Sequence, residues 1–209
     1  MLPLDSLLAL ILFGFVSSIT PGPNNLMLLA SGVNFGIRRT IPHMLGIGVG
    51  FALMVVLVGL GFGQVFARYP DLHVALKIVG TLYMVYLAWR LANGGGIGDS
   101  QRPKQPMAFL QAAAFQWVNP KAWAMAVSAI AAYTVPDHYT LSILTIAVVF
   151  GAVNLPSVSC WALFGLALRR VLSNVRIIRI FNVSMALLLI ASLFPVASEL
   201  WLFLRGSAV

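Results

Sequence analysis

Six long apolar segments occupy most of this 209-residue chain. A helix needs about 20 mostly apolar residues to cross the roughly 30 Å hydrocarbon core of a bilayer. Because 60% of the residues are hydrophobic and only 9% are charged, an ordinary soluble domain is excluded. The sequence therefore predicts an all-α polytopic membrane protein with six transmembrane helices, over residues 4–34, 41–66, 74–92, 107–133, 141–168 and 177–204.

Basic residues are concentrated in alternate loops, which indicates an orientation. If the N-terminus lies outside, nine basic residues face the cytoplasm and three face the exterior together with four of the five acids. This is the positive-inside pattern, so we expect both termini outside, and basic charge that meets anionic lipid headgroups rather than nucleic acid. The nine inner residues are Arg38, Arg39, Arg90, Arg102, Lys104, Arg169, Arg170, Arg176 and Arg179.

The middle of the chain divides it into two halves. Residues 93–106 are rich in Gly, Pro and charge, and are interpreted as a cytoplasmic linker between repeat one (1–92) and repeat two (107–209) of a single transmembrane domain. The TPGPN motif at 20–24 aligns with NPKAW at 119–123 at an offset near 100. Since each half has an odd number of helices, the halves are expected to form inverted repeats, the architecture of secondary transporters.

The stretch SITPGPNN at residues 18–25 interrupts the first apolar segment. Pro21 and Pro23 have no N–H, so two carbonyls lose their helical partners. We expect the first helix to break at 20–23 and a shorter helix to start near Asn24. Such irregular backbone at membrane depth is tolerated only where it is buried in protein or lines a cavity.

The freed carbonyls and the positive end of the following half-helix together suit an amino-acid zwitterion. The carbonyls would accept from an ammonium, and the helix N-terminus would attract a carboxylate. The candidate substrate-binding residues of this first break are Pro21, Gly22, Pro23, Asn24 and Asn25.

The fourth segment contains a second break, in QWVNPKAWAM at residues 116–125. Pro120 should free the carbonyl of Gln116, and Asn119 offers an amide. Lys121 would cost roughly 2.5–3.5 kcal/mol at a helix centre, so it should face a cavity, have a partner and attract a carboxylate. The alternative is a simple kink with Lys121 snorkelling to an interface. Gln116, Asn119, Pro120 and Lys121 are therefore candidate substrate-binding residues.

The fifth segment carries a polar cluster, NLPSVSCW at residues 154–161. Pro156 should release one helical carbonyl, while Asn154 offers hydrogen bonds and Trp161 a broad wall. Hydrogen bonding between helices explains the cluster as well as lining a pathway does. Asn154 and Trp161 join the candidates for substrate binding, with both interpretations left open.

Few residues favour catalytic, metal or redox chemistry. Cys160 is the only cysteine, and the histidines share no ligand spacing, so we expect no metal and no cofactor. His43 and Lys121 are candidates for proton coupling, although His43 also suits an interfacial histidine. An intramembrane enzyme would need a nucleophile with a base, or a metal with His and carboxylate ligands. The chain has no H-E-x-x-H motif, no paired acids, and no histidine near a membrane-depth serine by helical spacing.

The motifs TPGPNN, HMLGIGVGF, GTLYMVYLAWR and WVNPKAW resemble those of the lysine exporter (LysE/RhtB) family, along the whole chain. The resemblance implies an inner-membrane permease that exports amino acids or their derivatives, driven by the proton motive force. It carries the family's two motifs onto residues 21–25 and 119–121. Within the family, the NLPSVSCW stretch and the LAWR ending look closest to exporters of neutral amino acids, homoserine, threonine or cysteine-like compounds.

Three alternatives stay open beside this hypothesis: a passive channel or packing subunit, efflux of another small metabolite, and an intramembrane enzyme. No carboxylate at membrane depth is available for a second positive charge, which argues against a cationic substrate. Pairs of glycines four apart, Gly46 with Gly50 and Gly59 with Gly63, allow close helix packing and a possible homo-oligomer.

Overall fold

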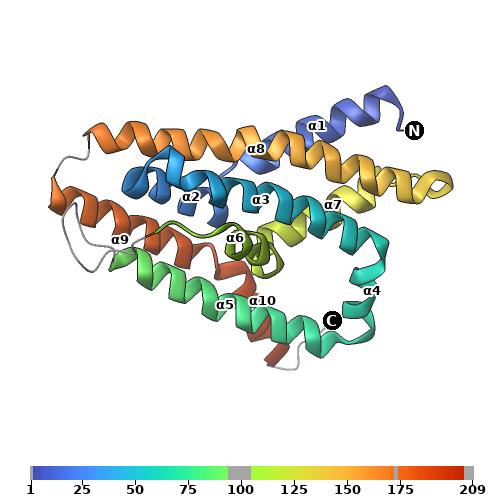
Figure 1. Cartoon of the computed structure of the whole chain (residues 1–209). Coiled ribbons are helices and arrows are strands. Elements are labelled where there is room, and N and C mark those ends of the chain that lie inside the picture. The colour runs from blue at the N-terminus through green and yellow to red at the C-terminus, as the bar shows by residue number, and fades with distance from the viewer. Residues whose placement is uncertain (1, 94–104, 172–173, 205–209) are drawn as a thin grey trace.

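The computed structural model describes residues 2–93, 105–171 and 174–204, and these ranges contain helices and no strand (Figure 1). The all-α prediction is therefore confirmed for the described chain. The helices are α1 (Leu4–Ile19), α2 (Pro23–Phe35), α3 (Ile37–Leu57), α4 (Gly63–Arg68), α5 (Pro70–Ala92), α6 (Phe109–Phe115), α7 (Pro120–Tyr133), α8 (Tyr139–Val171), α9 (Val175–Ala191) and α10 (Phe194–Leu204).

Four helical stretches are long and apolar enough to cross a membrane: Ile37–Phe62, Val74–Ala92, Pro136–Arg169 and Arg176–Ser198. A fifth is reached if α1 and α2, which are bent by 56° at their junction, form one span. The predicted fourth segment is divided between α6, of 7 residues, and α7, of 14 residues, each too short to span alone. The count of six spans and the inverted repeat therefore stay predictions.

The long helix α8 holds the first half of the chain together. It contacts α1, α2 and α3, while α5 lies against α9 on the other side of the molecule (Figure 1). Gly32 on α2 and Gly165 on α8 allow the tightest contact, because a Cβ at either position would overlap the backbone of the other helix. This contact fixes α2, and with it the break that precedes α2.

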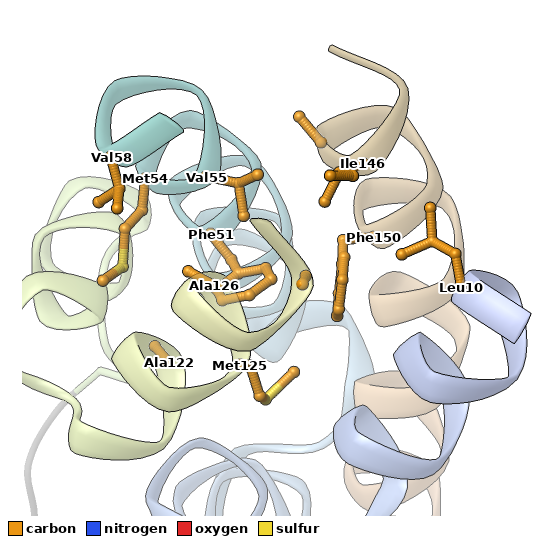
Figure 2. Close-up of a cluster of buried hydrophobic side chains, with 12 residues drawn as sticks. Leu10, Phe51, Met54, Val55, Val58, Ala122, Met125, Ala126, Ile146 and Phe150 are labelled. Carbon is orange, nitrogen blue, oxygen red and sulfur yellow. The ribbon is translucent and has the colours of Figure 1, made fainter. Parts of the chain in front are cut away.

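A buried hydrophobic cluster joins α1, α3, α7 and α8 (Figure 2). The rings of Phe51 and Phe150 meet edge to face, with centroids 5.2 Å apart, and Phe13 lies 6.0 Å from Phe150. Leu10 of α1 packs against the same cluster and is fully buried. Edge-to-face pairs of this kind are favoured by the charge distribution of the rings. The cluster thus packs α1 and α7 against the same two helices, α3 and α8.

The glycine pairs of the second segment serve packing, as predicted, where they can be described. A Cβ at Gly46 would overlap the Phe109 carbonyl, and a Cβ at Gly50 would overlap the backbone of Ala113. These glycines therefore bring α6 against α3. At Gly61, φ is 114°, a left-handed conformation that glycine adopts without strain, and the chain kinks there between α3 and α4.

Six arginines lie at one end of the helical bundle, and two acids lie at the other. The end of α2, the C-termini of α5 and α8, and the N-terminus of α9 lie together at the left of Figure 1. Asp71 and Asp137 lie at the other end, near the starts of α5 and α8. That the arginine-rich end faces the cytoplasm remains a prediction. Its described arginines are Arg38, Arg39, Arg90, Arg169, Arg176 and Arg179.

Candidate functional site

The first helix breaks where its prolines predict. Helix α1 ends at Ile19, α2 begins at Pro23, and the backbone of Gly22 between them is fully extended, with φ 179° and ψ 176°. Helical hydrogen bonding resumes only when Leu26 N–H donates to the Gly22 carbonyl at 2.9 Å. The predicted break at 20–23 and the restart near Asn24 are confirmed.

Side chains close to the break satisfy part of its freed backbone. The Thr20 hydroxyl donates to the Ser17 carbonyl at 2.9 Å. The Asn25 amide donates to the carbonyls of Ser18 at 2.8 Å and Thr20 at 2.7 Å, so both of its N–H donors are used. Because Asn25 is only 2% exposed, it is a structural clamp that folds the start of α2 back onto the end of α1.

Side chains from distant helices donate to the other backbone carbonyls at the break. The Trp161 indole of α8 donates to the Ile19 carbonyl at 2.9 Å. The Lys121 ammonium of α7 donates to the Thr20 carbonyl at 2.6 Å, the Thr20 hydroxyl at 2.9 Å and the Pro21 carbonyl at 3.3 Å. An ammonium has three donors, and these three acceptors match them.

A lysine predicted to lie at membrane depth needs hydrogen-bond partners, and Lys121 finds them in the broken backbone. The carbonyls expected to receive a substrate ammonium are occupied in this structure by the lysine itself. The Lys121 side chain is half-buried, and its ammonium bonds to this backbone. Gly22 permits this approach, because a Cβ there would lie 2.7 Å from Lys121 Cδ.

The second break lies between α6 and α7, with a single 3-10 turn, Gln116–Val118, before it. Asn119 is extended and caps α7, since its side chain accepts from Lys121 N–H at 3.2 Å. One expectation is corrected: the Gln116 carbonyl is not free, because the 3-10 turn lets Asn119 N–H donate to it at 3.3 Å. Helix α7 then begins at Pro120, where the missing N–H costs no hydrogen bond.

A pair of amides joins the two breaks. Asn24 Nδ2 donates to Gln116 Oε1 at 2.9 Å, and Gln116 Nε2 donates to Asn24 Oδ1 at 3.3 Å. Gln116 is fully buried and also donates to the Ala112 carbonyl at 2.8 Å. Two polar stretches that lie 92 positions apart in sequence are therefore held together by reciprocal hydrogen bonds.

The polar cluster of the fifth segment contacts the first break. Helix α8 continues through Pro156, so this proline does not divide the segment. The Asn154 amide donates to the Ser18 hydroxyl at 3.2 Å, and Asn154 Oδ1 has no hydrogen-bond partner although it is buried. Hydrogen bonding between helices is thus observed for Asn154 and for Trp161, and Asn154 also lines the small cavity described next.

Most of the candidate residues surround a small polar cavity of about 20 Å³, which has room for about one water molecule. Trp161 does not line this cavity. Pro21, Pro23 and Pro120 line a second, larger cavity, which is described below. The candidates that line the polar cavity are Gly22, Asn24, Asn25, Gln116, Asn119, Lys121 and Asn154.

A much larger cavity, which we call the Lys121 cavity, adjoins the polar one. It measures about 600 Å³, within the range of small-molecule sites, and is lined by α5, α7, α10 and the first break. Lys77 and Lys121 both line it, whereas no Asp or Glu among the described residues does. Lys121 and Gly22 line both cavities, so they form the boundary between them.

His43 lies apart from this site. It is 2% exposed on α3, and neither ring nitrogen has a hydrogen-bond partner. It is therefore buried within the protein, and it lines a third cavity, between α2, α5 and α9. The structure thus does not bring together the two candidates for proton coupling. Within the described residues, no three His, Cys, Asp or Glu side chains lie close enough to hold a metal.

Three further residues at the site are not among those predicted from the sequence. Ser18 and Thr20 supply hydroxyl and carbonyl groups to it, and Lys77 adds a second cation to the large cavity. The signal for the first two is the run Ser17, Ser18, Thr20 immediately before the prolines, in an otherwise apolar helix. Lys77 gave no such signal, because a lysine near a helix end is ordinarily interfacial.

Comparison with known proteins gives a consistent result. The family model of LysE type translocators matches residues 15–195. A cysteine/O-acetylserine efflux protein of Escherichia coli O139:H28 is 30% identical over 180 residues, which cover 85% of this chain and 90% of the relative. The proteins of the same name in Escherichia coli K12 and Salmonella typhimurium LT2 are 29% and 27% identical over the same coverage. No solved structure matches.

The matched region includes both helix breaks, the joining amides, and the lysine that bonds to the broken backbone. It also includes the helices α3, α5 and α8 that surround them. The chain therefore belongs to the LysE type translocator family.

Proposed function

We propose that this protein is an inner-membrane secondary transporter that exports neutral amino acids or their derivatives, driven by the proton motive force. One observation carries the proposal. Lys121, at the start of half-helix α7, donates hydrogen bonds to the broken backbone that precedes half-helix α2. It lies at the boundary between the small polar cavity and the larger Lys121 cavity. Discontinuous helices that meet at a polar site are the usual construction of substrate sites in secondary transporters.

Both half-helices direct their N-termini toward the same place. Helix α2 begins at Pro23 and α7 begins at Pro120, and both prolines line the Lys121 cavity. Helix N-termini carry a partial positive charge, which the Lys121 ammonium reinforces. The substrate carboxylate would bind here, and the carbonyls of Thr20 and Pro21 would receive the substrate ammonium.

In this binding mode the substrate replaces Lys121 at the broken backbone. The lysine already makes three hydrogen bonds that a primary ammonium of a substrate would make equally well. Exchange therefore releases Lys121 toward the substrate carboxylate without leaving the carbonyls unsatisfied. A site that a protein side chain closes when empty would also limit leakage of ions.

Charge favours a neutral amino acid over a cationic one. Lys77 and Lys121 line the large cavity, and no described acid lines any of the three cavities. A second positive charge on the substrate would therefore be unpaired at membrane depth, where unpaired charge is costly. The names of the relatives make cysteine and O-acetylserine the first compounds to test.

The remaining parts of the proposal concern topology and energy coupling. Six spans in two inverted repeats, with both termini outside, would place the arginine-rich end in the cytoplasm next to anionic lipid. Lys121 is the first candidate for proton coupling because substrate exchange would change its partners, and His43 is the second. A homo-oligomer is compatible with the exposed apolar helix faces but is not required by them.

Everted membrane vesicles provide the test. Vesicles that contain the protein are given radiolabelled L-cysteine, O-acetyl-L-serine, L-threonine, L-homoserine and L-lysine, with and without a protonophore. We expect accumulation of neutral compounds that the protonophore abolishes, and no accumulation of lysine. Strictly downhill movement would favour a channel, whereas chemical conversion of a compound by purified protein would favour an enzyme.

A further inference from the structure

The third cavity lies at the arginine-rich end of the bundle, and we call it the Arg90 cavity. It measures about 100 Å³, and one water needs roughly 10–15 Å³, so it can hold a ligand of several non-hydrogen atoms. Five parts of the chain line it: α2, α3, α5, α9, and the segment from residue 105 into α6. Its polar lining includes Asn34, His43, Tyr83, Arg90, Gln111 and Asn182.

Two of these side chains have unused hydrogen-bonding capacity. His43 is 2% exposed, and neither of its ring nitrogens has a partner. Both nitrogens are shielded from solvent, so a ligand would reach one of them only after the ring turns toward the cavity. A buried polar group without a partner costs about 1–3 kcal/mol, which such a ligand would then offset. Arg90 Cζ lies 5.8 Å from the centroid of the Tyr86 ring, and no described carboxylate pairs with the guanidinium.

The amides opposite are already ordered. Asn34 donates to the Asn182 side chain at 3.0 Å and to the Ala30 carbonyl at 2.8 Å, which fixes the orientation of its amide. Both N–H donors of Asn34 are thus used, and its oxygen is left as an acceptor. The Arg90 cavity therefore combines a cation, an imidazole and a preorganised amide oxygen.

An apolar cluster separates the Arg90 cavity from the Lys121 cavity. Met27 and Leu87 of this cluster line the Arg90 cavity, whereas Met84 and Leu193 line the Lys121 cavity. Its remaining buried members are Ala88, Phe115, Ala186 and Leu189. The two cavities thus lie on opposite sides of one plug, which contains two flexible methionines.

Helix α5 extends past both cavities. Lys77 lines the Lys121 cavity, and Arg90, thirteen positions later, lines the Arg90 cavity. At 1.5 Å per residue this separation is about 20 Å along the helix. One helix therefore carries a cation into each cavity, on either side of the plug.

We propose that the Arg90 cavity is a second amino-acid-binding site, which binds the substrate on the cytoplasmic side of the plug before it reaches Lys121. The inference rests on the proposed function and adds a site to it. The substrate carboxylate binds the Arg90 guanidinium, and its ammonium donates to His43 and to the Asn34 amide oxygen. Movement of the plug residues then opens the path to the Lys121 cavity.

The test measures initial rates of O-acetyl-L-serine and L-cysteine uptake in everted vesicles, which expose the cytoplasmic face. We expect Arg90→Gln to raise KM about ten-fold or more, since the substrate loses a charge-assisted hydrogen bond, with little change in maximal rate. Arg39→Gln is the matched control, because Arg39 is exposed at the same end and lines no cavity described here.

A substrate lacking the carboxylate makes the assignment specific. L-cysteinamide should compete poorly with L-cysteine for the unmodified protein, and Arg90→Gln should reduce that discrimination, leaving the part that Lys121 and the helix N-termini contribute. His43→Leu should also raise KM while the melting temperature stays the same or rises, because the change removes an unpartnered buried polar group. If His43 had a merely structural role, its replacement by leucine would instead lower the melting temperature.

The outcomes separate this site from the proposed function. Unchanged KM values in both Arg90→Gln and His43→Leu, with normal uptake by the unmodified protein, would overturn the second site alone. Absence of uptake by the unmodified protein, with its presence in the membrane confirmed, would overturn the proposed function and the second site with it.

Discussion

Alanine at Gly22 tests whether Lys121 bonds to the broken backbone as the structure shows. The extended backbone of Gly22 suits any residue, so the substitution introduces no backbone strain. An added Cβ would lie 2.7 Å from Lys121 Cδ and 3.2 Å from Nζ, whereas ordinary contacts begin at 3.4 Å. The lysine side chain is flexible and would move away, but its ammonium would then leave the Thr20 carbonyl.

The expected cost is the loss of one hydrogen bond to a charged group, about 1.5–3 kcal/mol. For a chain of this size, each kcal/mol shifts the melting temperature by about 2–4 °C, so Gly22→Ala should melt about 3–12 °C lower. Tryptophan fluorescence of the purified protein in detergent can follow the transition. Gly48→Ala is the matched control, because no atom lies within 4 Å of a Cβ at that position.

The lysine can be removed to isolate its contribution. In a Lys121→Ala background the methyl group of Gly22→Ala meets none of the three atoms nearest to it, since all three belong to Lys121. The substitution should then be neutral or slightly stabilising. A Gly22→Ala protein that melts like the unmodified one, or that is equally destabilised without Lys121, would refute this account of the break.

Further predictions concern the contacts that hold the breaks in place. Asn24→Leu and Gln116→Leu should each destabilise the protein by about 1–3 kcal/mol in detergent melting, and the double variant by less than their sum, because the two amides share their hydrogen bonds. Additive effects would contradict the pairing. Gly50→Ala should cost about 1–3 kcal/mol in the same assay, since the new methyl meets the backbone of α6. Trp161→Phe keeps the ring but removes the donor to the carbonyl before the break, so a loss of about 1 kcal/mol is expected, and an unchanged melting temperature would contradict it.

Proline chemistry made the helix breaks predictable from sequence. Pro21, Pro23 and Pro120 each remove an N–H, a local effect that depends on no distant residue. Pro156 shows the limit of the rule, because α8 continues through it. A single proline inside a long helix can be accommodated when neighbouring helices support the helix on both sides of it.

The partners of the broken backbone could not be predicted, because they come from distant helices. Nothing local to Lys121 shows that its ammonium reaches Thr20, 101 positions earlier. The apolar face of α8 likewise does not indicate that Trp161 donates to Ile19. Such contacts depend on how the helices pack, and that packing is set by the glycines and aromatic rings of several segments at once.

Arg90 illustrates a different limit. In the sequence it is one of nine basic residues at the inner ends, where charge sets orientation. In the structure it differs from an exposed arginine such as Arg39, because it lines a cavity that also contains an unpartnered histidine. Composition places a charge at one end of a bundle, but only the fold shows what the charge faces.

Transport by purified protein tests the central claim most directly. The protein and its Lys121→Ala variant are reconstituted into liposomes with an imposed proton gradient, and uptake of labelled O-acetyl-L-serine or L-cysteine is followed. The account predicts uptake above the equilibrium level by the unmodified protein, abolished by a protonophore and by the variant although the variant is folded and inserted. Equal gradient-driven uptake by the Lys121→Ala variant would contradict the role of Lys121 at the helix breaks.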